Sequence, residues 1–211
     1  MGDDVQWKKA EKPQKIQNVL GHPQLRPLID DWERRVPDPR IRSSLNDKLA
    51  RLSPDRPFWV AALLFDLYQN PETLPSYCKT VGDQRSEEEA SNEIFQEALP
   101  HYFRLQKVST VSNTPKVEKQ ANLAIRMIAS LLSDVQLVSV YLALRMQKLE
   151  WPEPLDDEEK QQSAWINLYV DAPLASRIGI FWIKSELEDR AFQILQPCLL
   201  YTSDAADDLW C

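Results

Sequence analysis

Histidine and cysteine side chains, which serve in many catalytic and metal sites, are few in this 211-residue chain. It has two histidines, His22 and His101, and three cysteines, Cys78, Cys198 and Cys211. The cysteines form no Cys-x-x-Cys pair and are too few for a disulfide framework. Two imidazoles leave little for a mechanism that needs several, such as a zinc site or a Ser-His-Asp triad combined with a metal. None of the four glycines lies in a phosphate-binding loop motif, so the chain shows no obvious active site.

The composition predicts one domain, or one and a half, with a real core, because 43% of the residues are hydrophobic and 27% are charged. The net charge of −7 argues against a large basic surface, so no direct binding of nucleic acid is expected. There is no apolar run of about 18 residues and the first residues are polar. We therefore expect no membrane span, no signal peptide and a cytoplasmic protein.

The secondary-structure pattern predicts an all-α fold. Glycine is scarce, good helix formers are plentiful, and no long segment alternates apolar with polar residues. Fifteen prolines divide the chain into helix-sized pieces, from which we expect about eight to ten helices. His101 is expected to be a half-buried structural histidine and His22 a loop residue.

Two helices can be predicted in the first half of the chain. Ser53-Pro54-Asp55-Arg56 should open a helix that is apolar on nearly all faces and that Asn70-Pro71 closes. Ser86-Glu87-Glu88-Glu89 resembles a capping box. Pro100 should limit or kink the helix that follows this capping box.

The stretch 117–150 is long for one helix, and Ser133-Asp134 in its middle predicts two. The first should carry Leu123, Met127 and Leu131 on an apolar face. The second, 135–149, is apolar on most faces and should therefore be central.

The last part of the chain is predicted to hold two further helices. Asp156-x-x-Glu159 should start a helix bearing Trp165, and Gly179 should separate it from the last helix. On that last helix Glu186 and Arg190 can pair at i, i+4. Its apolar residues should share one face: Ile183, Leu187, Ala191 and Ile194.

Residues 198–211 continue neither a helical period nor a turn pattern. From Cys198 to Asp208 they resemble the translation of a transposon end used in sequencing-library preparation. We expect this tail to be non-native and dispensable, and the natural gene to continue past Pro197.

Two motifs near the end of the chain carry a resemblance to a known family. They are Ala172-Pro173-Leu174-Ala175-Ser176-Arg177-Ile178-Gly179 and, after a four-residue spacer, Lys184-Ser185-Glu186-Leu187-Glu188-Asp189. They resemble the A-P-L-A-x-R-L-G and K-W-E-L-E-D motifs of the RelA/SpoT family of (p)ppGpp synthetases and hydrolases. The differences are Ile178 in place of Leu and Ser185 in place of Trp. The resemblance covers roughly residues 55 to 197.

The resemblance implies three parts: a degenerate HD domain in 1–155, helices in 156–197 that lead to a missing synthetase domain, and the tail 198–211. In hydrolase-competent relatives two histidines and two aspartates hold manganese. The resemblance places Ser43, Phe65, Asp66 and Leu144 at these four positions, so one ligand survives. It implies no manganese site and no hydrolysis, as in RelA-type synthetase-only members. Phe65 and Leu144 should then be buried together, and Asp66 should serve as a capping or salt-bridging residue.

The leading hypothesis is an inactive regulatory or structural fragment of a stringent-response (p)ppGpp synthetase. As the resemblance implies, the parent would transfer pyrophosphate from ATP to the 3′-hydroxyl of GDP or GTP, aided by magnesium. This fragment would hold no catalytic residue and no cofactor, and Phe181-Trp182 could face the missing synthetase domain. One alternative is a metal-dependent HD-type phosphohydrolase with other ligands, which the absence of any His-Asp dipeptide disfavours. Another is a stand-alone all-α interaction module, which the gene sequence after Pro197 would distinguish.

Overall fold

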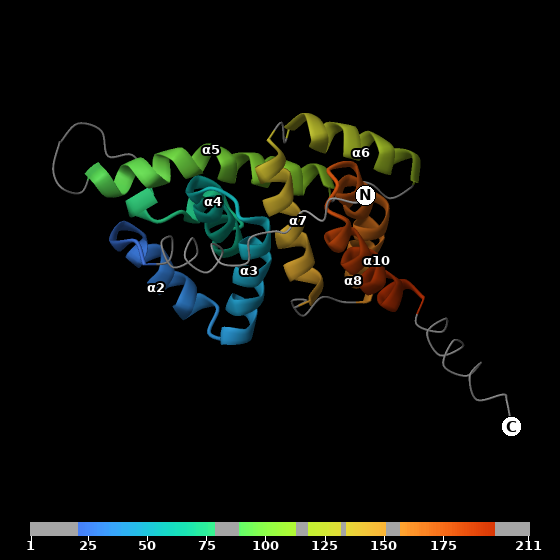
Figure 1. Ribbon diagram of the computed structural model, residues 1–211, viewed down its shortest axis with the longest axis horizontal. Coiled ribbons are helices and arrows are strands. Elements are labelled where there is room, and N and C mark those ends of the chain that lie inside the picture. The colour runs from blue at the N-terminus through green and yellow to red at the C-terminus, as the bar shows by residue number, and fades with distance from the viewer. Residues whose placement is uncertain (1–20, 79–88, 113–117, 132–133, 151–156, 197–211) are drawn as a thin grey trace, which may run out of the picture. The chain divides into compact units, whose positions relative to one another are not determined.

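The computed structural model describes residues 21–78, 89–112, 118–131, 134–150 and 157–196 (Figure 1). Every regular element within these ranges is helical, and nine of them are α-helices, so the predicted all-α fold is confirmed. The chain forms two compact units that join in sequence between Phe103 and Arg104.

The first unit contains most of the short elements. In chain order its elements are η1 (Pro23–Leu25), α2 (Arg26–Arg35), α3 (Pro39–Leu52), α4 (Arg56–Leu67), η2 (Pro71–Thr73) and η3 (Ser76–Cys78), followed by the first part of α5 (Glu89–Ser112). His22 precedes η1 and is half-buried.

Helix α4 is the most completely buried element of the first unit. All eight residues from Phe58 to Phe65 are buried, as the continuous apolar run predicts. The preceding helix α3 ends at Leu52. The next residue, Ser53, has a left-handed backbone (φ 51°) that turns the chain toward α4. Helix α2 packs against α4. The predicted start of α4 after Asp55 is confirmed, and α4 ends at Leu67, three residues before Asn70-Pro71.

Helix α5 continues through Pro100 to Ser112, so Pro100 does not end the helix, and the alternative, a kink at Pro100, stays a prediction. Proline removes one backbone hydrogen bond, but the buried residues Phe95, Ala98 and Tyr102 hold the helix on both sides of it. His101 is half-buried, as predicted, and its ring packs on Phe58 with 4.2 Å between the centroids. The predicted capping box before this helix lies outside the described residues, except for Glu89.

The second unit contains the remaining helices. They are the last part of α5, α6 (Glu118–Leu131), α7 (Val135–Glu150), α8 (Asp157–Ile166), the π-helical turn η4 (Asn167–Asp171), α9 (Ala172–Arg177) and α10 (Phe181–Leu195). The predicted division of 117–150 into two helices is confirmed. Of the predicted start at Asp156, only the helix from Asp157 onward lies among the described residues.

Helix α6 uses a different face from the one predicted. Its buried residues are Ala121, Ala124, Ile125 and Ile128, whereas Leu123 is 59% and Met127 is 45% exposed. The expectation that Leu123, Met127 and Leu131 form the core face is therefore wrong. The buried face combines two alanines with two isoleucines, so the i, i+4, i+8 spacing of Leu123, Met127 and Leu131 does not identify the core side of this helix. Helix α7, in contrast, is buried from Leu137 to Gln147, as predicted for a central helix.

A π-helical turn precedes the first family-like motif. Pro173 cannot donate a hydrogen bond, and in a regular α-helix its ring would clash with the carbonyl of Tyr169. The chain instead widens into η4, where the Ala172 amide bonds to the Asn167 carbonyl. After α9, Gly179 adopts φ +80° and separates α9 from α10, as predicted.

Candidate functional site

The four predicted ligand positions lie on three helices. Ser43 is exposed on α3, Phe65 and Asp66 stand in the last turn of α4, and Leu144 belongs to α7 in the second unit. Phe65 is 6% exposed and Leu144 is 5% exposed, so each is buried as expected. Their predicted contact with each other stays a prediction.

Asp66 is held by a residue of α2. Its Oδ2 atom accepts a hydrogen bond from the indole Nε1 of Trp32 at 3.1 Å. Trp32 is itself 3% exposed, so this bond lies at the packed contact between α2 and α4. No local spacing in the sequence indicates this indole partner, because Trp32 and Asp66 are 34 residues apart.

The side chains at these four positions do not fit a divalent cation. Manganese is bound in proteins through imidazole and carboxylate groups, whereas Phe65 and Leu144 offer only hydrocarbon and Ser43 offers an exposed hydroxyl. Asp66 is the single carboxylate of the set, and it already accepts the bond from Trp32. Across the described ranges, no three His, Cys, Asp or Glu side chains are grouped so that they could hold a metal ion.

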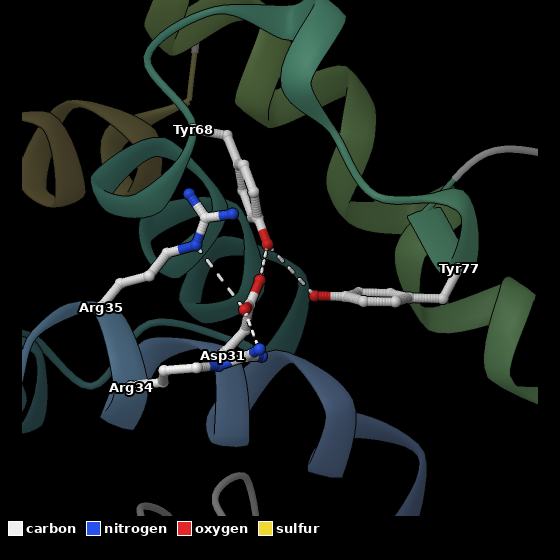
Figure 2. Close-up of polar contacts among 5 residues, drawn as sticks. All are labelled: Asp31, Arg34, Arg35, Tyr68 and Tyr77. Carbon is white, nitrogen blue, oxygen red and sulfur yellow. Dashed lines mark hydrogen bonds and ion pairs between the residues drawn. The ribbon is translucent and has the colours of Figure 1, made fainter.

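A second carboxylate, that of Asp31 on α2, organises the polar cluster shown in Figure 2. The Tyr68 hydroxyl donates to Asp31 Oδ2, and Arg34 Nη2 lies 2.6 Å from Asp31 Oδ1. The Arg35 guanidinium lies over the Tyr68 ring, 4.8 Å from its centroid. The Tyr77 hydroxyl approaches the Tyr68 hydroxyl at 3.4 Å. At the end of α4, Asp31 thus holds Tyr68, and Trp32 holds Asp66.

This cluster offers no nucleophile at neutral pH. Burial, together with neighbouring Cys78 and Asp31, raises the pKa of the Tyr77 hydroxyl above its usual value. Burial and Asp31 raise the pKa of the Cys78 thiol to about 12. Both groups therefore stay protonated, and we interpret the cluster as structural.

Cys78 should consequently be unreactive in the folded chain. In a Cys198→Ser/Cys211→Ser variant it is the only thiol, and at pH 8 only about one molecule in ten thousand would carry its thiolate. We expect Ellman's reagent to label this variant only after addition of guanidinium chloride. Stoichiometric labelling of the native variant within minutes would show that the thiol is accessible and its pKa ordinary.

The second unit contains a buried ion pair next to the first family-like motif. Arg145 Nε lies 2.8 Å from Asp171 Oδ2, and the Tyr141 hydroxyl donates to Asp171 Oδ1 at 2.8 Å. The Arg145 and Asp171 side chains are 9% and 0% exposed. Asp171 is the last residue of η4, so the π-helical turn delivers its carboxylate to two residues of α7. Arg145 directly follows the predicted ligand position Leu144.

The motif residues fall into two groups in the structure. Most have a role within the second unit. Gly179 forms the left-handed turn, Pro173 lies in the first turn of α9, and Lys184 pairs with Glu188 at 2.8 Å. The predicted pair of Glu186 with Arg190 is confirmed at 2.6 Å. The buried motif residues are Ala172, Leu174, Ala175 and Leu187. The second group, Arg177 and Asp189, is exposed.

The sequence held one usable signal for the residues that were missed. Arg145 is the one arginine in the otherwise mainly apolar helix 135–149, and a buried arginine requires a counter-charge. That signal could have predicted an ion pair, but not its partner. Asp31 showed only ordinary i+3 and i+4 spacing to Arg34 and Arg35, which is common on exposed helices.

Comparison with known proteins agrees with this architecture. Residues 43–181 match the family model described as "HD domain", which defines the class of protein. A GTP pyrophosphokinase of Myxococcus xanthus is 33% identical over 122 residues, which is 56% of this chain and 16% of that protein. A GTP pyrophosphokinase of Streptomyces antibioticus is 28% identical over 200 residues, 84% of this chain and 23% of that protein.

A third relative carries both activities in its name. It is the bifunctional (p)ppGpp synthase/hydrolase SpoT of Escherichia coli K12, 26% identical over 144 residues, 67% of this chain and 20% of that protein. The chain therefore belongs to the RelA/SpoT family of HD-domain proteins. It spans about a fifth of the length of these relatives. In the part of the chain that the structure describes, no helix is long and apolar enough to cross a membrane.

Proposed function

We propose that this chain is a hydrolase-inactive HD region of a stringent-response (p)ppGpp synthetase. In the parent protein it would act as a structural and regulatory partner of the synthetase domain. The parent reaction would be transfer of pyrophosphate from ATP to the 3′-hydroxyl of GDP or GTP, with magnesium bound in the synthetase domain. The HD region would occupy 1–155, the connecting helices 156–197, and the adapter-like tail 198–211.

The observation that carries this proposal is the chemistry at the four ligand positions. Two of them hold the buried hydrocarbon side chains Phe65 and Leu144, and an unpaired polar group in their place would cost about 1–3 kcal/mol. The one carboxylate, Asp66, has an indole donor in Trp32. Hydrolysis of a pyrophosphate through a metal-bound water would need a donor set that these residues do not provide.

The relatives support the synthetase half of the proposal. Two of the similar proteins described above are named GTP pyrophosphokinase, and the chain corresponds to a minor share of each. An HD region without its own chemistry can still bias a neighbouring domain, provided that it contacts the active and inactive arrangements differently. Reading the gene beyond the codon for Pro197 tests this half: a synthetase-like sequence is expected there, and a stop codon would favour a stand-alone module.

The purified chain should release no pyrophosphate from ppGpp in the presence of manganese. Product formation can be followed by anion-exchange chromatography over several hours, with the Escherichia coli bifunctional synthase/hydrolase as the positive control. Turnover by this chain that a chelator abolishes would refute the proposal and support a metal-dependent phosphohydrolase with other ligands.

A further inference from the structure

The outward face of α10 carries two exposed aromatic side chains. Phe181 is 65% exposed and Phe192 is 44% exposed. They are eleven residues apart, and because an α-helix turns by 100° per residue they lie within about 20° of each other around the axis. Ser185 falls on the same line between them, and the buried residues Ile183, Leu187 and Ala191 lie on the opposite side. We call Phe181, Ser185 and Phe192 the α10 stripe.

The α10 stripe is complementary to itself when two helices run antiparallel. A two-fold axis that passes between Glu186 and Leu187 places Phe181 opposite Phe192 of a second copy, at both ends of the pairing. Residues on the same flank meet in an antiparallel pair, so Lys184 comes within about one residue's rise, 1.5 Å, of the level of Glu188 of the second copy. A symmetric contact of this kind needs only one patch per molecule.

The charges on this flank suit such a pairing. Within one chain Lys184 Nζ lies 2.8 Å from Glu188 Oε2, and both side chains are about one-third exposed. Two copies would extend this pair into an alternating set of two lysines and two glutamates. Ser185 at the middle is small, and small side chains at a contact allow helix axes to approach more closely.

From this pattern we propose that the α10 stripe is a homodimerisation surface whose occupant is the antiparallel α10 of a second copy of the chain. A 15-residue helix is about 22 Å long, so the contact is smaller than a standard interface of roughly 800 Å² per partner. We therefore expect a reversible dimer, with a dissociation constant on the order of 10–100 µM. This occupant competes with the expectation that Phe181 faces the missing synthetase domain, and a chain that stays monomeric would overturn the dimer and favour that other occupant.

Sedimentation velocity of the full 211-residue chain, in a Cys198→Ser/Cys211→Ser background, tests the surface. From about 5 to 500 µM the sedimentation coefficient should rise from the monomer to the dimer value. Phe181→Ser/Phe192→Ser should weaken dimerisation at least about tenfold, because it removes both apolar anchors. The matched control is Leu123→Ser/Met127→Ser, which removes two equally exposed apolar side chains from α6 and should leave dimerisation unchanged.

A charge exchange tests the flank without changing composition. Lys184→Glu alone should weaken the dimer at least about threefold, because it brings like charges together. Adding Glu188→Lys should restore it, since the alternating pattern returns with its signs reversed. Circular-dichroism melts of every variant verify that the helices remain folded.

Disulfide trapping tests the direction of the two helices. In the same background Ser185→Cys should cross-link to itself under mild oxidation, because the two copies are offset by only about 4.5 Å along the axis. Gln196→Cys should not, because the antiparallel arrangement separates its two copies by about 28 Å. Efficient cross-linking of Gln196→Cys would overturn the antiparallel arrangement. A chain that stays monomeric at every concentration, or a dimer that Phe181→Ser/Phe192→Ser leaves unchanged, would overturn the proposed surface.

Discussion

Replacing Asp171 with asparagine is expected to lower the free energy of unfolding by about 3–5 kcal/mol. The substitution keeps the shape of the side chain but removes the charge that faces Arg145 Nε at 2.8 Å. Burial alone would lower the pKa of Arg145, but Asp171 and Tyr141 hold it above its usual value. Arginine stays protonated in proteins even without that support, so Asp171→Asn would leave Arg145 charged and buried without its counter-ion. Urea denaturation followed by circular dichroism measures the loss.

Two controls separate burial from charge pairing in general. Asp30→Asn breaks the Arg26–Asp30 pair, which is also short at 2.9 Å but has side chains 72% and 51% exposed. It should cost less than about 1 kcal/mol. The double replacement Arg145→Met/Asp171→Leu should cost much less than Asp171→Asn, because it removes both buried charges together. Equal effects of Asp171→Asn and Asp30→Asn would contradict a desolvated pair.

Truncating Phe65 to alanine should cost a similar amount, about 3–5 kcal/mol. Its side chain is 6% exposed at the end of a helix that is buried from Phe58 onward, so the change leaves a cavity among packed neighbours. Denaturant melts give the difference in free energy. Leu123→Ala on α6, where the side chain is 59% exposed, is the matched surface truncation and should cost less than about 1 kcal/mol. A loss of less than about 1 kcal/mol for Phe65→Ala would indicate an open cleft instead of a core.

Phe65→His extends this experiment to the lost ligand. It places an imidazole at a buried apolar position beside a carboxylate that already accepts a bond from Trp32. We expect Phe65→His to lower the free energy of unfolding, because a buried polar group without hydrogen-bond partners is costly. We also expect no manganese affinity, because the positions of Ser43 and Leu144 still lack an imidazole or a carboxylate. Melts with and without manganese show the difference, and stabilisation by the metal would mean that the site is one substitution from function.

The helix boundaries could be predicted from the sequence because they depend on local chemistry. Arg56 begins α4 and Gly179 precedes α10, as proline, capping and glycine signals indicated. The core face of α6 could not be predicted in the same way, because this helix is apolar on two sides. The spacing of Leu123, Met127 and Leu131 favoured one face, whereas the buried face carries Ala121, Ala124, Ile125 and Ile128.

The polar contacts of the candidate site were harder to predict. Tyr68 and Asp31 are 37 residues apart and Arg145 and Asp171 are 26 apart, so no local spacing rule joins them. The burial of Phe65 followed from its apolar neighbours. The anchoring of Asp66 by Trp32 did not, because it depends on how α2 packs against α4.

The π-helical turn also sets the rotational phase of everything that follows it. A turn closed over five residues holds one more residue than an α-turn, so later side chains are rotated by about 100° relative to an uninterrupted α-helix. With this rotation, the side chains of Leu174 and Ala175 face the core. Deleting one residue from 167–171 would restore a regular α-helix and leave those side chains facing the core, whereas the present sequence wound as a plain α-helix would turn them by about 100°. A relative that lacks one residue in this turn can therefore keep the same core face after it, so an alignment gap within 167–171 is compatible with a buried residue at the position of Leu174.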